Sequence, residues 1–147
     1  MMNTSETFSL LFNKNQNTAY KALKILQEES EHTNQVYPFL DTMIDMLDSG
    51  HSYIRTRALI LIACNAKWDR ENKIDKIIDQ YLGHITDEKP ITARQCIKQL
   101  PMLARYKPEL KEKILFALHS ADVDRYDESM RALIVKDIQK AVKEIQK

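Results

Sequence analysis

Apolar residues recur three and four positions apart along most of this chain, which is the spacing of amphipathic helices. No segment alternates between apolar and polar residues for long enough to predict a strand. Proline and glycine mark several of the turns between the helical segments. The pattern predicts an all-α protein with eight helices: Thr4–Asn13, Asn15–Glu31, Asn34–Asp48, Ser52–Ala66, Trp68–Leu82, Asp87–Arg105, Lys107–Leu118 and Asp127–Gln146.

One predicted helix differs from the others because it has no polar face. Within Ser52–Ala66, the residues from Ala58 to Cys64 form an unbroken apolar run. A helix that is apolar all round is normally enclosed by its neighbours, and this run is far shorter than the roughly 20 residues that span a bilayer. We therefore expect Ser52–Ala66 to be the central buried helix. Gly50 is expected to end the preceding helix in a left-handed conformation.

Composition supports one helix-rich globular domain spanning residues 1–147. The chain is 44% apolar and contains only two glycines and four prolines. The formal net charge of +1 gives no general attraction to nucleic acid or to a membrane. The charge is uneven, since residues 1–89 hold 10 Lys/Arg against 13 Asp/Glu and residues 90–147 hold 12 against 8. The first residues do not form a basic segment followed by a long apolar core, so we expect no secretory signal and a cytoplasmic protein.

Related helices recur at a nearly constant interval. A period near 37 residues that is built from two helices predicts a stack of helical hairpins, an α-α superhelix. Four related tripeptides begin 36, 37 and 37 residues apart: Lys21-Ala22-Leu23, Arg57-Ala58-Leu59, Arg94-Gln95-Cys96 and Arg131-Ala132-Leu133.

The middle of the chain resembles a HEAT repeat. In that pattern an apolar-x-Pro-x-Leu helix leads to an acidic turn and then to an apolar-Arg-x-x-Ala helix, which matches the residues from Val36 to Asp48 and from Ile54 to Ala58. The third unit departs from the pattern, because Gln95 replaces the alanine. The resemblance covers about residues 15–146, and it implies a short α-solenoid of the HEAT/ARM type with about three and a half repeats.

The chain is also similar to short bacterial HEAT-like proteins that carry an iron–sulfur-assembly (SufBD) label. It has no cysteine cluster that could hold iron, so its residues do not support that role.

The sequence offers no constellation for catalysis, a metal or a cofactor. Cys64 and Cys96 lie in apolar helical patterns and form no CxxC motif, so we interpret them as buried reduced thiols. Two glycines cannot build a phosphate-binding loop. Equivalent turns of stacked helices lie 8–10 Å apart, too far for a shared zinc ion. We therefore predict that the protein is not an enzyme, and we interpret four histidines as turn residues: His32, His51, His84 and His119.

The resemblance also implies a structural ladder of ion pairs. An acidic residue precedes each repeating arginine by seven positions, and in similar proteins such pairs bridge adjacent units. The alternative is that these are ordinary surface ion pairs, which contribute about 0–1 kcal/mol. The predicted ladder residues are Asp48, Arg55, Arg57, Asp87, Arg94, Asp124 and Arg131.

The second helix of each pair lines the concave side of a HEAT-like stack, and we expect a partner to bind there. Most of the side chains that we assign to this groove are acidic, with Tyr37 and Phe116 as apolar anchors. Such a strip would suit a Lys/Arg-bearing segment of another protein, or the basic C-terminal region of a second copy. The candidate partner-binding residues are Tyr37, Asp41, Asp45, Asp75, Asp79, Glu112 and Phe116.

Two function classes follow from the resemblance. The first is a non-catalytic adaptor or interaction module that holds another protein in its groove. The second is a nucleic-acid-binding module, because a HEAT-like stack also supports a family of alkylpurine DNA glycosylases. An acidic groove repels phosphates, so we favour the adaptor. It also remains open that the acidic residues are ordinary solvated side chains.

Overall fold

The computed structural model describes residues 2–147, which form α-helices and short 3₁₀ turns without any strand. The 3₁₀ turns mostly begin or end the α-helices; they are Leu10–Phe12, Tyr37–Phe39, Ala66–Trp68, Gly83–Thr86 and Pro108–Leu110. The α-helices are α1 (Thr4–Ser9), α2 (Gln16–His32), α3 (Leu40–Met46), α4 (Ser52–Cys64), α5 (Lys73–Lys76), α6 (Ile78–Leu82), α7 (Pro90–Tyr106), α8 (Lys111–His119) and α9 (Glu128–Ile145).

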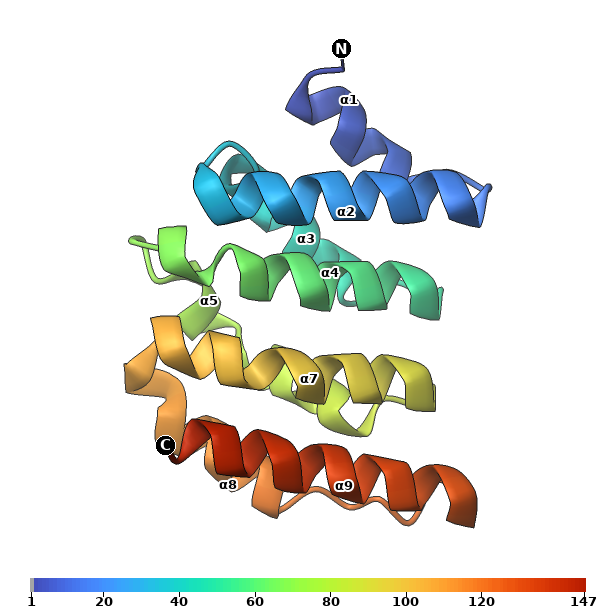
Figure 1. Ribbon diagram of the computed structural model, residues 1–147, viewed down its shortest axis with the longest axis vertical. Helices are drawn as coiled ribbons and strands as arrows, with labels where there is room; N and C mark the ends of the chain where they lie inside the picture. The colour runs from blue at the N-terminus through green and yellow to red at the C-terminus, as the bar shows by residue number, and fades with distance from the viewer. Residues whose placement is uncertain (1) are drawn as a thin grey trace.

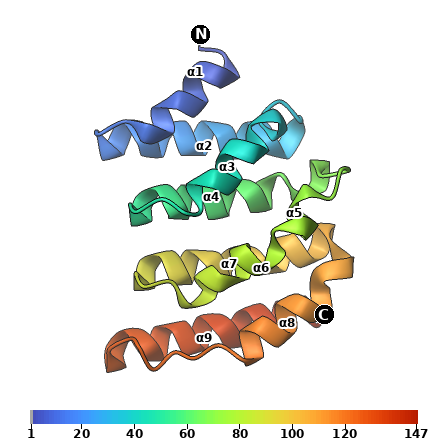
Figure 2. The ribbon, with the colours of Figure 1, turned by 180° about the vertical axis from the view of Figure 1, so that it is seen from behind.

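The helices form two layers. The four long helices α2, α4, α7 and α9 lie side by side in one layer, and their N-terminal ends are all on the same side (Figure 1). The shorter helices α3, α5, α6 and α8 form the second layer behind them, and α1 packs against α2 at the N-terminal end of the stack (Figure 2). Each short element precedes the long helix with which it pairs, so the stack has four pairs with the two chain ends at opposite ends (Figure 1). This confirms the predicted all-α stack of helical hairpins.

The predicted central helix is α4. It lies between α2 and α7, with α3 behind it. Leu59, Leu61 and Ile62 are completely buried, and even the first turns of the helix bury Arg55 and Arg57. The helix therefore has no exposed polar face, as the unbroken apolar run predicts.

Two local predictions are wrong. No glycine in residues 2–147 has a positive φ, so Gly50 is not a left-handed cap. The helix predicted over Trp68–Leu82 is instead divided into α5 and α6. Asn72 takes the left-handed conformation, with φ of 57°, and the carboxylate of Asp69 accepts hydrogen bonds from the backbone N–H groups of Lys73 and Ile74. Asp69 thus caps α5 from a position four residues before its first residue, Lys73.

Candidate binding surface

The exposed face of the long-helix layer carries a groove near the N-terminal ends of its helices. Here three large side chains remain exposed although they lie close to the core: Tyr20 of α2 at 57%, Tyr53 of α4 at 41% and Ile91 of α7 at 67%. The groove has a volume of about 670 Å³, and Leu23 and Ile60 form part of its apolar floor. We call it the apolar groove; its remaining lining residues are Gln16, Asn17, Ser52, Thr56, Arg57, Lys89, Pro90, Thr92, Gln95 and Met130.

The apolar groove contains two cationic residues and no acidic one. Arg57 is buried, and its guanidinium donates hydrogen bonds of 2.6 Å to the carbonyl of Leu11 and to the side chain of Gln16. Lys89 is exposed at the start of α7. The N-termini of α4 and α7 have no side-chain cap, so their free N–H groups add partial positive charge at the same edge. The groove therefore combines apolar side chains with a weakly positive rim.

A second groove lies at the opposite, C-terminal ends of the long helices. Its volume is about 780 Å³, and five cationic residues line it together with two glutamates. We call it the basic groove; its charged residues are Glu31, Lys67, Lys98, Arg105, Lys111, Glu144 and Lys147. A smaller hollow lies between the two and adds Lys24 and Glu28 to the charged residues on this face. Together the three depressions present eight cationic residues against three acidic ones.

The seven predicted partner-binding residues do not lie on this face. Tyr37 lies in the 3₁₀ turn before α3, Asp41 and Asp45 in α3, Asp75 in α5, Asp79 in α6, and Glu112 and Phe116 in α8. All of these belong to the first, shorter element of each pair, in the layer that Figure 2 shows in front. The expected location is therefore corrected: the groove of the second helices is lined by other residues and is basic rather than acidic.

Several of the predicted acidic residues are partly neutralised where they lie. Asp41 pairs with Lys73 at 3.3 Å and Asp79 with Lys113 at 3.4 Å, each across adjacent units. Both lysines come from the unit that follows the carboxylate, so the acidic residues do not form a strip of free charge. Phe116 is 73% exposed. Whether this short-helix surface binds a partner stays a prediction.

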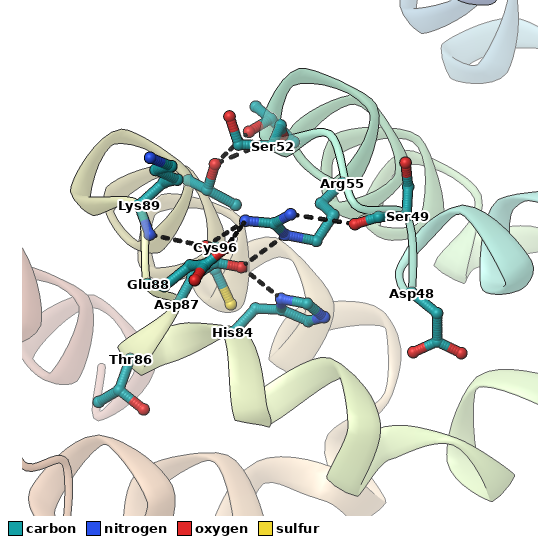
Figure 3. Close-up of polar contacts among 12 residues, drawn as sticks. Asp48, Ser49, Ser52, Arg55, His84, Thr86, Asp87, Glu88, Lys89 and Cys96 are labelled. Carbon is teal, nitrogen blue, oxygen red and sulfur yellow. Dashed lines mark hydrogen bonds and ion pairs between the residues drawn. The ribbon is translucent and has the colours of Figure 1, made fainter.

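The predicted ladder has one buried rung, and it pairs residues of different units. The guanidinium of Arg55 donates two hydrogen bonds to the carboxylate of Asp87, at 2.8 and 3.0 Å (Figure 3). Both side chains are almost fully buried, with 7% and 3% exposed. The carboxylate also receives contacts from the His84 ring at 2.7 Å and from the N–H of Lys89 at 2.9 Å. Burial alone would raise the pKa of Asp87, but Arg55, Lys89 and His84 outweigh it and hold the pKa below its usual value.

The Asp87 cluster consists of these four residues and Tyr126. The hydroxyl of Tyr126 donates to the carbonyl of Asp87, so the cluster joins the second, third and fourth helix pairs. Burial raises the pKa of Tyr126 to about 12, which keeps it a hydrogen-bond donor at neutral pH. The buried cluster therefore connects three consecutive helix pairs to one another.

The other predicted ladder residues are arranged differently. Arg94 pairs with Asp137 of α9 at 2.6 Å instead of with Asp124. Asp48 points away from Arg55 (Figure 3) and accepts a hydrogen bond from Gln80. Two further arginines bind backbone carbonyls: Arg57 reaches Leu11, as described, and Arg131 reaches Tyr126. The predicted ladder is therefore not a regular series. Only Arg55 forms a buried ion pair with another ladder residue, and the remaining arginines bind Asp137 or backbone carbonyls.

A second buried cluster was not predicted. Tyr37 donates to the carboxylate of Asp69 at 2.6 Å, and the ammonium of Lys107 lies 3.1 Å from the same carboxylate and 2.9 Å from Asp75. Burial alone would lower the pKa of Lys107, but the two carboxylates outweigh it and raise the pKa. This Asp69 cluster, completed by Asn72, also joins three consecutive pairs. A spacing of 32 residues from Tyr37 to Asp69, as from Arg55 to Asp87, is the signal that could have revealed it.

Polar contacts also hold both edges of the interface between the first and second helix pairs. At the N-terminal edge, Arg57 of α4 binds the carbonyl of Leu11. At the C-terminal edge, the indole N–H of Trp68 donates to the carbonyl of Ser30 at 2.8 Å.

Within residues 2–147, no group of three or more His, Cys, Asp or Glu side chains is arranged to hold a metal ion. Cys64 and Cys96 are free thiols, and burial raises the pKa of both, which makes them poor nucleophiles at neutral pH. In the same range, no helix has the length and apolar character needed to cross a bilayer.

The family comparison agrees with this architecture over almost the whole chain. The family model described as a HEAT repeat domain matches residues 1–142. No curated protein and no solved structure matches the chain.

Proposed function

The chain belongs to the HEAT-repeat family, and on that premise we propose that it is a non-catalytic interaction module that holds another protein on its long-helix face. HEAT repeats generally mediate protein interactions. The proposal identifies the apolar groove as the principal contact site. It includes no catalytic step and no cofactor.

The exposure of Tyr20, Tyr53 and Ile91 carries this proposal. Interface centres are enriched in aromatic and large apolar side chains, and a few such residues provide most of the binding energy. These three come from three different helices and share one groove with hydroxyl and amide groups that can bind a backbone. An isolated apolar residue on a surface needs no explanation, but three that converge on one groove favour a binding site.

The finer parts of the proposal concern location and assembly. Two free thiols suit the reducing cytoplasm, which supports a cytoplasmic role. Self-association between the basic groove and the acidic residues of the short-helix layer is also compatible with the charge distribution. Such a contact would join different surfaces, so sedimentation velocity should show chains of increasing length with concentration rather than a closed dimer.

Site-specific photocrosslinking in the native host tests the contact site. A crosslinking amino acid replaces Tyr53 in one variant and Phe116 in the matched control, because both positions are exposed and aromatic but lie in different layers. We expect a discrete crosslinked protein with the Tyr53 variant that is lost when Ile91 is changed to Asp. A crosslink from Phe116 alone, which disappears in Asp41→Lys/Asp79→Lys, would overturn the choice of face and support the short-helix surface. No crosslink from either position would count against an interaction module.

A further inference from the structure

We infer that the partner segment is acidic, and that it lies along the long helices with its apolar side chains in the apolar groove and its carboxylates toward the basic groove. This inference rests on the proposed function and specifies the chemistry of the partner at the same face.

The three depressions follow one another turn by turn along the helices. On α2 the apolar groove includes Tyr20, and the smaller hollow includes Lys24, one turn further on. On α4 the same step leads from Ile60 to Cys64. The smaller hollow and the basic groove then share Lys67 and two other residues. A bound segment can therefore pass from one end of the layer to the other without leaving the surface depressions.

Charge determines which kind of segment fits. Eight cationic and three acidic residues line the three depressions, so this face has a surplus of five positive charges although the whole chain carries only +1. The remaining surface therefore has a net charge of −4. Lys98, Arg105 and Lys111 line the basic groove without any ion pair in residues 2–147. Carboxylates of a partner would form ion pairs with these three residues.

The length of the face limits the length of the segment. From Gln16 to Glu31, α2 spans 15 residue steps, or about 22 Å at 1.5 Å per residue. An extended strand covers this distance with about seven residues at 3.3 Å each. The partner segment needs apolar side chains near one end and carboxylates near the other.

A protein segment suits this face better than a nucleic acid. Of the three exposed apolar side chains in the apolar groove, the most exposed is the aliphatic Ile91, which offers neither charge nor a stacking surface to a base. Glu28, Glu31 and Glu144 line the path at intervals. They would repel a phosphate at every nucleotide, whereas a peptide can place its carboxylates selectively.

The test is selection from a random peptide library of about 12 residues, displayed on phage and panned on the immobilised full chain. We expect the enriched peptides to contain several Asp or Glu residues beside two or more large apolar residues. Their affinity, measured by fluorescence anisotropy with synthetic copies, should fall about tenfold in Lys98→Glu/Arg105→Glu and in Ile91→Asp. The matched control is Lys136→Glu/Lys143→Glu, the same charge change on exposed residues of α9 outside the depressions, and it should leave binding unchanged.

Three results with the peptides would overturn the inference: enriched peptides that are neutral or basic, binding that is insensitive to Lys98→Glu/Arg105→Glu, or no enrichment. Tighter binding of a labelled single-stranded oligonucleotide of equal length would overturn it in favour of a nucleic acid. The proposed function stands or falls separately. A crosslinked partner at Tyr53 whose contacting segment lacks acidic residues would refute only the acidic chemistry.

Discussion

Replacing Asp87 with Asn is the most direct test of how the stack is held together. In the structure the Asp87 carboxylate is the counter-charge of the buried Arg55 guanidinium and accepts contacts from His84 and the Lys89 backbone. Asparagine has the same shape but no charge, and it turns an N–H₂ group toward donors. The change would leave the buried Arg55 guanidinium with only the exposed Glu88 carboxylate, 3.8 Å away, as a counter-charge.

The expected loss is large because removal of one member of a buried ion pair costs about 3–5 kcal/mol. Domains have a total free energy of unfolding of about 5–15 kcal/mol, so the variant would lose a substantial part of it. In urea, with a slope of about 2 kcal/mol per molar, the unfolding midpoint should fall by roughly 2 M. Urea titration followed by far-ultraviolet circular dichroism measures this shift.

Asp79→Asn is the matched control, because the same chemical change breaks the exposed pair with Lys113. We expect it to cost at most about 1 kcal/mol. If Asp87→Asn lowers the midpoint no more than Asp79→Asn does, the buried cluster contributes no special stability and the reasoning is refuted.

Three further predictions concern stability. Leu61→Ala, in the completely buried centre of α4, should destabilise the protein by about 2–5 kcal/mol, and a melt within a degree or two of the unchanged protein would contradict the central position of that helix. Deletion of residues 127–147 should cause aggregation in size-exclusion chromatography, because α9 covers apolar side chains of α7 and α8; a monomeric truncation with an unchanged melt would sink the idea. Acid should also unfold the protein. The pKa values of Asp69 and Asp87 are lowered in the folded state, so their stabilising contribution is complete above the unfolded pKa of about 4 and is lost as the pH falls through their folded values. A double Asn variant, if it stays folded, should show a weaker dependence on pH between about 5 and 2 in urea titrations.

Much of the fold could be predicted because the apolar spacing reflects burial directly. The unbroken run in α4 indicated its central position, and the recurring tripeptides indicated the stacking. The break between α5 and α6 could not be predicted in this way, because the apolar stripe of Ile74, Ile78 and Tyr81 continues across it. The break lies at Ile77, whose φ of −114° and ψ of 17° are not helical, and the late start of α5 follows from the left-handed Asn72 and the cap provided by Asp69. The apolar stripe records neither of these backbone features.

The binding surface was harder to predict, because the spacing indicates which residues are equivalent but not to which of the two helix layers they belong. The acidic residues on α3 and α6 are indeed equivalent, but they belong to the short-helix layer and face lysines of the next unit. Tyr20, Tyr53 and Ile91 each fit an apolar helical pattern, so the sequence alone does not distinguish them from core residues. Only the stacked geometry shows that they remain exposed together.

A stack of helical hairpins can bend when successive helix pairs rotate relative to each other about their shared interface. Such a rotation opens one edge of an interface while it closes the other, and in this protein buried or partly buried polar contacts hold both edges. The Asp87 cluster holds the N-terminal edges of the later interfaces and the Asp69 cluster holds their C-terminal edges, while Arg57 and Trp68 hold the first. Bending would break contacts whose loss costs several kcal/mol. We therefore expect a rigid scaffold whose grooves keep one curvature. A partner must then match a fixed shape, and the entropy lost through ordering on binding is lost by the partner alone.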